Sequence, residues 1–422
     1  MRNRKIILLL AVLALIAAAC AGDAGDDTDA GTEAPAATEA PAATEAPAAT
    51  EAPAATEAPA ATEAPAGDGL PGEGVSVTMG RANWSSGYFQ AEVYRQIIGE
   101  LGYSVSDPGD QEVDPSLGYL AMAQGDMDLW VNSWYPGHLA WHEAELPDGT
   151  LVGDHVEIVG GVFLGGGIQG FLITKSFADE YGVTTMDDFN SNPDAIAAYD
   201  EHDPVPGNGI ADIYGCSESW TCDNIIQNQI AFGDGENSWG NIVQVIAGYD
   251  AMFAEAVSKV DEGLPAIIYT WTPTAYITQL RPGDNVYWLG TAAVLDDSNP
   301  ADQEGGAAHQ QEVGPGGESS FLPIPADQCP AAGNTDDGLC PLGWLPATVT
   351  PTAASAFLDA NPAVHKLLEV AALPVVDVSL ATVAIEAAGG AQDTVVAQAT
   401  AWIEANRAMV DGWIAEAMAA AG

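Results

Sequence analysis

Short apolar segments alternate with longer segments of helical periodicity beyond residue 70. Segments rich in apolar, β-branched and aromatic residues are predicted to be strands: residues 74–79, 127–134, 171–174, 266–271 and 286–289. Strands separated by helices indicate an α/β fold, in which ligand-binding loops follow the carboxyl ends of strands.

Helices are predicted where the apolar positions recur every three or four residues. Phe89, Val93, Ile97, Ile98 and Leu101 have this spacing, with Ser85 and Ser86 as candidate N-terminal caps and Gly102 as the end of the helix. Further helices are expected at 117–124, closed by Gly125, at 249–262, and in Ala-rich stretches after Pro351. Residues 300–346 are rich in Gly and Pro and predict a long irregular loop.

The strongly negative net charge of the chain excludes some classes of protein. The 422 residues, enough for two or three domains, include 60 acidic and only 10 basic side chains, a net charge of −50. This balance excludes a nucleic-acid-binding protein and disfavours adsorption to anionic lipid through basic residues. An acidic, Lys-poor surface keeps a protein soluble at high salt, so the composition fits either a salt-stressed host or an acidic bias of its lineage.

The first twenty residues have the pattern of a secretory signal peptide. Arg2, Arg4 and Lys5 precede an apolar run at residues 6–19, which is short for a membrane span. The last three residues of the run are alanines, and together with Cys20 they resemble a bacterial lipobox, in which the cysteine is diacylated. We therefore expect an extracytoplasmic lipoprotein anchored to the outer face of the cell membrane. An ordinary secreted protein cleaved nearby is the alternative.

Residues 21–69 are predicted to be a disordered tether. Thr-Glu-Ala-Pro-Ala-Ala repeats run from about residue 32 to 66. Proline at every sixth position prevents a helix, and no large apolar side chain is present to form a core. The segment is interpreted as a spacer between the lipid anchor and the folded part.

The four remaining cysteines fall into two close pairs. Cys216 and Cys222 are six positions apart, and Cys329 and Cys340 are eleven positions apart. Two local disulfides are expected for a protein outside the cytosol, although other pairings are compatible with the sequence.

Three tryptophans stand in polar turns where predicted strands end. Trp134 lies in residues 132–138, Trp220 lies between Cys216 and Cys222, and Trp271 is followed by a Thr-Pro turn. Each one alone would fit a buried core residue. Three together favour a binding site, and a disulfide around Trp220 would fix that side chain before a ligand arrives.

Several indole faces suit a quaternary ammonium group, which has no N–H to donate. Each ring contributes about 0.5–2 kcal/mol through cation–π attraction. Three rings fall short of the roughly 8 kcal/mol that micromolar affinity needs, so another group must hold the far end of the ligand. His138 and the backbone N–H groups around Thr221 are candidates for binding a carboxylate.

Five segments carry a resemblance to a known family: residues 132–138, 169–173, 208–223, 269–273 and 280–283. Over residues 74–422 the chain resembles the substrate-binding proteins of glycine betaine/proline betaine ABC importers, the ProX-like members of the OpuAC type. The three tryptophans of that family's ammonium cage match Trp134, Trp220 and Trp271. A histidine that helps to hold the carboxylate matches His138.

Two features depart from the family pattern. The glycine that follows the loop tryptophan is replaced by Thr221, which keeps a backbone N–H but adds a side chain. The insertion at 300–346, with Cys329 and Cys340, is also absent from the pattern.

The resemblance implies a two-lobed periplasmic-binding-protein fold of type II, with the ligand in the cleft between the lobes. The first lobe would comprise residues 70–165 and 291–422, and the second residues 166–290. A monomer is expected that captures a betaine, delivers it to ABC permease and ATPase subunits, and touches the membrane only through its lipid anchor. We expect no cofactor, no metal and no enzymatic activity.

Two other classes of protein share some of these features. His138, His142 and Glu143 have a spacing that could place zinc ligands on one helical face, but no third ligand stands out. The long tether would also suit a cell-surface adhesion or wall-binding lipoprotein.

Overall fold

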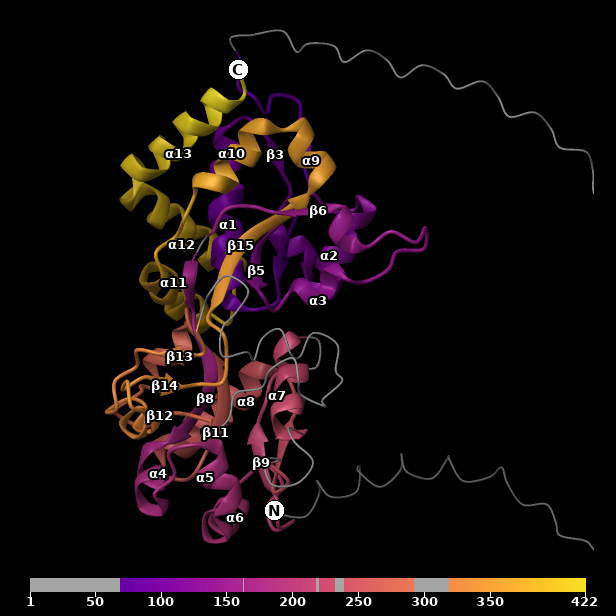
Figure 1. Cartoon of the computed structure of the whole chain (residues 1–422). Coiled ribbons are helices and arrows are strands. Elements are labelled where there is room, and N and C mark those ends of the chain that lie inside the picture. The colour runs from indigo at the N-terminus through magenta and orange to yellow at the C-terminus, as the bar shows by residue number, and fades with distance from the viewer. Residues whose placement is uncertain (1–68, 162, 218–219, 232–238, 292–318) are drawn as a thin grey trace, which may run out of the picture. The chain divides into compact units, whose positions relative to one another are not determined.

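The computed structural model describes residues 69–161, 163–217, 220–231, 239–291 and 319–422 (Figure 1). The predicted signal peptide, Cys20, the tether up to residue 68 and the first part of the 300–346 loop lie outside the described residues. Pro65–Gly422 forms one compact unit, and the following description concerns this unit.

The first sheet of the described residues has six strands. Its order is β4-β2-β5-β15-β6, and β7 also pairs with β15. The strands are β2 (Met79–Ala82), β4 (Glu112–Val113), β5 (Leu129–Tyr135), β6 (Val156–Ile158), β7 (Phe163–Gly167) and β15 (Ala347–Ala354). Strand β2 runs parallel to both β4 and β5, so the carboxyl ends of these three strands lie at one edge of the sheet.

Helices cover this sheet on two sides, with α11, α12 and α13 on one side and α2 and α3 on the other (Figure 1). The helices are α1 (Ser85–Glu100), α2 (Pro115–Gln124), α3 (Leu139–His142), α9 (Ser355–Ala360), α10 (Pro362–Val370), α11 (Val375–Ala387), α12 (Gln392–Ala405) and α13 (Arg407–Ala420). Of the described helices, none is long and apolar enough to cross a membrane by itself, and α10 and α11 pass that test only jointly, across a 99° bend.

Helix α1 forms where the apolar periodicity predicts it, and Phe89, Val93 and Ile98 on its inner face are fully buried. The predicted caps are wrong. Extended Trp84 is the N-cap residue, and Ser85 and Ser86 are already the first two helical residues. The reason is that β2 continues to Ala82, which leaves only two residues between strand and helix.

The second sheet has five strands in the order β10-β9-β11-β8-β12. Its strands are β8 (Gln169–Thr174), β9 (Ala211–Tyr214), β10 (Ile242–Val245), β11 (Ile267–Trp271) and β12 (Val286–Leu289). The accompanying helices are α4 (Lys175–Tyr181), α5 (Met186–Ser191), α6 (Pro193–Asp200), α7 (Thr221–Ala231) and α8 (Tyr249–Asp261). Two sheets with their own helices form the two-lobed α/β arrangement that the sequence predicts.

One predicted strand is divided in the structure. The segment 74–79 contributes β1 (Ser76–Val77), which pairs with β3 (Ser104–Val105), and then the first residue of β2. Between them, Thr78 donates its backbone N–H to the carboxylate of Asp128 at 2.7 Å. The single strand expected here is therefore wrong.

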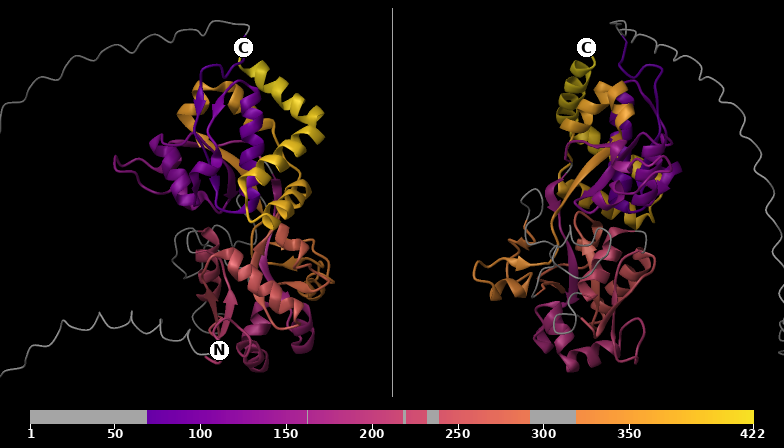
Figure 2. Two further views of the ribbon diagram at one scale, coloured as in Figure 1. Left: turned by 180° about the vertical axis from the view of Figure 1, so that it is seen from behind. Right: turned by 45° about the vertical axis from the view of Figure 1, so that its right-hand side comes forward.

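Residues 319–345 form a small insertion beside the second sheet. It contains β13 (Phe321–Leu322), β14 (Cys340–Pro341) and the 3₁₀ turn η5 (Pro330–Asn334), and the predicted disulfide Cys329–Cys340 is present. Backbone bonds run from Trp288 N–H to Gln328 (2.8 Å) and from Thr291 N–H to Pro341 (2.7 Å). Figure 2 shows the orange insertion in the same half of the molecule as the second sheet. The predicted first lobe, with residues 291–422, includes the insertion, and these backbone bonds connect the insertion to β12 and to Thr291 just beyond it.

Candidate ligand-binding site

Three parallel strands of the first sheet deliver side chains to one edge. Trp84 follows β2, Pro115 follows β4, and Trp134 stands near the end of β5, with His138 just beyond it. Because β4, β2 and β5 are parallel neighbours, these side chains lie close together although they are up to 54 positions apart.

The second sheet contributes side chains to the opposite side of the site. Trp271 ends β11 and stands opposite Gln169 at the start of antiparallel β8. The parallel neighbour β9 ends at Tyr214, and the chain then passes through the disulfide loop to Trp220 and the first turn of α7. The strand ends of the two sheets therefore supply both sides of one site.

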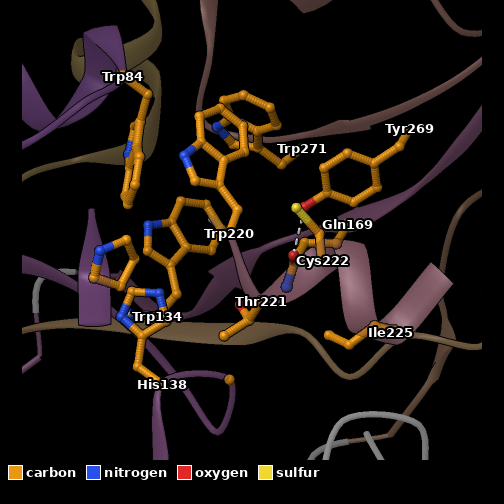
Figure 3. Close-up of a pocket in the computed structure, with 12 residues that line it drawn as sticks. Trp84, Trp134, His138, Gln169, Trp220, Thr221, Cys222, Ile225, Tyr269 and Trp271 are labelled. Carbon is orange, nitrogen blue, oxygen red and sulfur yellow. Dashed lines mark hydrogen bonds between the residues drawn. The ribbon is translucent and has the colours of Figure 1, made fainter. Parts of the chain in front are cut away.

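The side chains from both sheets line one pocket (Figure 3). All five residues predicted to bind ligand line it: Trp134, His138, Trp220, Thr221 and Trp271. The other residues that line it are Trp84, Pro115, Gly137, Gln169, Cys222, Ile225 and Tyr269.

Trp220 connects the two sides of the pocket. Its indole N–H donates to Asn83 Oδ1 on the first lobe at 3.0 Å. Its ring stands edge-on to Trp271, with centroids 5.4 Å apart, and edge-on to Trp84, with centroids 5.3 Å apart. The predicted disulfide Cys216–Cys222 closes the loop that carries Trp220, and both cysteines are buried.

One amide oxygen orients two of the indoles. Asn132 Oδ1 accepts the N–H of Trp84 at 2.7 Å and the N–H of Trp134 at 2.8 Å. Asn132 itself is fully buried within β5. Because an indole has a single N–H donor, at the edge of its ring, this arrangement fixes that edge in the protein.

His138 is nearly buried, and its Nδ1 is already engaged. The Trp134 backbone N–H donates to Nδ1 at 3.2 Å, and the Tyr119 hydroxyl lies 2.9 Å from the same nitrogen. Burial raises the pKa of Tyr119 well above its ordinary value, so its hydroxyl keeps its proton. An Nδ1 that accepts a hydrogen bond carries no proton, so a neutral His138 has its proton on Nε2, the donor that a carboxylate would require.

His138 and His142, whose spacing is the basis of the zinc alternative, are not arranged as a metal site. His142 Nε2 lies 2.8 Å from the Tyr135 hydroxyl, whereas His138 Nδ1 faces Tyr119. Among the residues that the structure describes, no group of three or more His, Cys, Asp and Glu side chains could hold a metal ion.

Sequence analysis did not assign Trp84, Gln169 or Tyr269 to the site. The Tyr269 hydroxyl donates to Gln169 Oε1 at 2.7 Å, and burial raises the pKa of this tyrosine well above its ordinary value. Behind it, the buried Trp344 of the insertion packs with its ring centroid 5.2 Å from that of Tyr269. The signal for Gln169 and Tyr269 was present, because both lie in segments that carry the family resemblance.

Two lobes with an aromatic pocket formed by strand ends from both sheets define an α/β binding protein. A family model described as the substrate binding domain of ABC-type glycine betaine transport systems matches residues 75–405. The chain belongs to this family. Membership confirms the predicted family and the prediction that the protein is a binding protein rather than an enzyme.

A curated relative is similar over most of the chain, and solved structures share the fold. The glycine betaine/proline betaine-binding periplasmic protein of Escherichia coli (strain K12) is 29% identical over 354 residues, which cover 83% of this chain and 92% of that protein. An ABC-transporter choline-binding protein in complex with choline has a TM-score of 0.55 at 16% identity, covering 82% of this chain and 96% of that one. Lactococcal OpuAC in its closed, glycine betaine-bound form has a TM-score of 0.54 at 14% identity, covering 81% and 99%. The structural matches confirm the predicted two-lobed periplasmic-binding-protein fold.

Proposed function

We propose that the protein captures glycine betaine or a related quaternary ammonium osmolyte in the pocket between its lobes. Trp134, Trp220 and Trp271 would surround the methylated cation. His138 Nε2 and backbone N–H groups around Thr221 would hold the carboxylate. The observation that carries this proposal is the convergence of the three indoles, from separate segments, on one pocket.

The charge of the pocket supports a zwitterion as ligand. Of the described residues that line it, none is Asp, Glu, Lys or Arg. A singly charged ligand would lose its hydration there without an opposite charge to replace it. A betaine carries both charges and is neutral overall, which lowers the cost of transferring it into the pocket.

The energetics require both ends of such a ligand. Three indoles supply roughly 2–6 kcal/mol, and a hydrogen bond to a charged group adds about 1.5–3 kcal/mol. Together these reach the roughly 8 kcal/mol of micromolar affinity only when the cation and the carboxylate are bound at once. The site should therefore prefer betaines to choline, which has the cation alone.

The remaining parts of the function follow from the family and from the sequence. The loaded protein would act outside the cytoplasm and pass its ligand to the permease of an ABC importer. Cys20 would carry the lipid anchor, and the repeats at 21–69 would let a monomeric binding domain reach the permease. Uptake of an osmolyte would suit the acidic composition of a protein exposed to high salt.

Calorimetric titration with glycine betaine, proline betaine, choline and carnitine tests the proposal. We expect heat of binding with the betaines, and a loss of about 5–30-fold in affinity for Trp220→Ala. Trp402→Phe is the control, because Trp402 is also a buried tryptophan but lies outside the pocket. Absence of binding to all four compounds would refute the function. A larger loss from the control than from Trp220→Ala, in a folded protein, would refute the assignment of the cage.

A further inference from the structure

Trp84 lies in the same pocket as the three predicted tryptophans but comes from a different segment. It is the N-cap residue of α1, immediately after the Asn83 that accepts the Trp220 indole N–H. Its side chain is 8% exposed, and it lines the pocket on the first lobe. Figure 3 shows its ring facing the group formed by Trp134, Trp220 and Trp271.

The contacts of Trp84 fix its orientation. The N–H edge is held by Asn132 Oδ1, which holds the Trp134 indole in the same way. The fully buried Trp130 packs behind it, with ring centroids 6.4 Å apart at 47°. Trp84 is therefore anchored at its edge, flanked by Trp130 and Trp220, and lines the pocket in a fixed orientation with 8% of the residue exposed. A preformed ring loses little entropy when a ligand binds.

A comparison within the chain separates this arrangement from ordinary packing. Trp402 is also 8% exposed, and its N–H also donates to an oxygen, Asp377 Oδ2, at 2.9 Å. Its ring stacks on Trp413 at 6.3 Å and 22°, and it does not line the pocket. Burial and hydrogen bonding are therefore matched in the two tryptophans, and position at the pocket is the difference.

We infer that Trp84 is a fourth aromatic wall of the cation site and contributes to recognition of the positive charge. The inference rests on the proposed function, since it requires a quaternary ammonium ligand. A fourth ring would allow the pocket to discriminate charge without any acidic side chain. A trimethylammonium group and a tert-butyl group have nearly the same shape, and only the former is attracted by the negative face of an indole.

The test uses glycine betaine and 3,3-dimethylbutanoate, an isostere in which a neutral carbon replaces the ammonium nitrogen. Both have a carboxylate and three methyl groups. The isostere is a net anion and pays an additional desolvation cost, but this cost is common to all variants, so the change in the affinity ratio from one variant to another reports the attraction for the cation. In Trp84→Leu we expect glycine betaine to bind about 2–30-fold more weakly and the isostere to change much less, so the ratio falls. Trp84→Phe keeps an aromatic ring with a weaker cation–π attraction and should give an intermediate ratio. Trp402→Leu is the matched control and should leave the ratio unchanged.

Each outcome separates the explanations. Equal losses of both ligands in Trp84→Leu would show that Trp84 acts by shape alone and would overturn the inference, while the proposed function would stand. If the Leu variant does not fold, the Phe variant decides: a ratio equal to that of the wild type overturns the inference. A wild-type protein that binds neither compound would overturn the proposed function and the fourth wall with it.

Discussion

Two substitutions of His138 separate the roles of its two ring nitrogens, Nδ1 and Nε2. Asn places its side-chain amide near the position of Nδ1, and Gln places its amide near that of Nε2. His138→Asn therefore keeps an acceptor for the Trp134 N–H and the Tyr119 hydroxyl, and removes the Nε2 donor. His138→Gln does the reverse.

His138→Asn should mainly change ligand affinity, whereas His138→Gln should mainly change stability. A hydrogen bond to a charged group contributes about 1.5–3 kcal/mol, so His138→Asn should weaken glycine betaine binding by about 10–150-fold. Choline has no carboxylate, and its affinity should be nearly unchanged. In His138→Gln, the Trp134 backbone N–H loses its acceptor and the Tyr119 hydroxyl loses one of its partners, which costs about 1–3 kcal/mol of stability and lowers the melting temperature. Part of the preference for betaine should survive in that variant.

Calorimetry with both ligands and thermal unfolding of all three proteins check this prediction. The informative quantity is the ratio of glycine betaine affinity to choline affinity, because general damage to the pocket cancels in it. If His138→Asn weakens both ligands by the same factor, His138 shapes the site without contacting the carboxylate, and the reasoning from the two nitrogens is wrong.

Three further predictions concern the disulfide, the contact between the lobes, and pH. Replacing Cys216 and Cys222 by Ser should lower affinity while cooperative unfolding persists, because so short a loop constrains little of the unfolded chain; loss of cooperative unfolding would contradict this. Asn83→Ala removes the acceptor of the Trp220 N–H and should speed ligand dissociation by about 2–13-fold in stopped-flow measurements; an unchanged rate would mean that this bond does not help to retain the ligand. Burial lowers the pKa of His142, so the unfolded chain binds a proton that the folded chain excludes. Stability should therefore fall as pH drops from about 6.5 to the lowered value, and His142→Gln should flatten the slope in denaturant titrations; an identical slope would assign the effect to other groups.

The parts of the site that depend on local signals could be predicted from the sequence. Trp134 and Trp271 stand in short motifs at the ends of strands, and Trp220 stands in the Cys216–Cys222 loop; each motif is recognisable without knowledge of the rest of the fold. Trp84 has no such motif. It reaches the pocket only because β2 pairs in parallel with β5, a contact between segments about 50 residues apart in sequence.

Long-range packing also explains why sequence order alone does not place the insertion. Residues 319–345 lie between the second sheet and β15 in sequence, so their order alone does not say which lobe they join. The insertion joins the second sheet through backbone hydrogen bonds to the region of β12. Its Trp344 ring also packs against Phe171 and Tyr269 of that sheet. The domain boundaries at 165 and 291 remain predictions.

The edge-on contacts of Trp220 have an optical consequence. Indole transitions couple when rings lie within a few ångströms at a fixed angle, and Trp220 is within 5.4 Å of Trp271 on its own lobe and 5.3 Å of Trp84 on the other. The coupling with Trp271 would persist whenever the second lobe is folded, whereas the coupling with Trp84 requires the lobes to be together. The near-ultraviolet circular dichroism of the unlabelled protein should therefore contain a contribution from the Trp220–Trp84 pair that is lost if the two lobes separate, so that the contact between the lobes could be read by spectroscopy without attaching a dye.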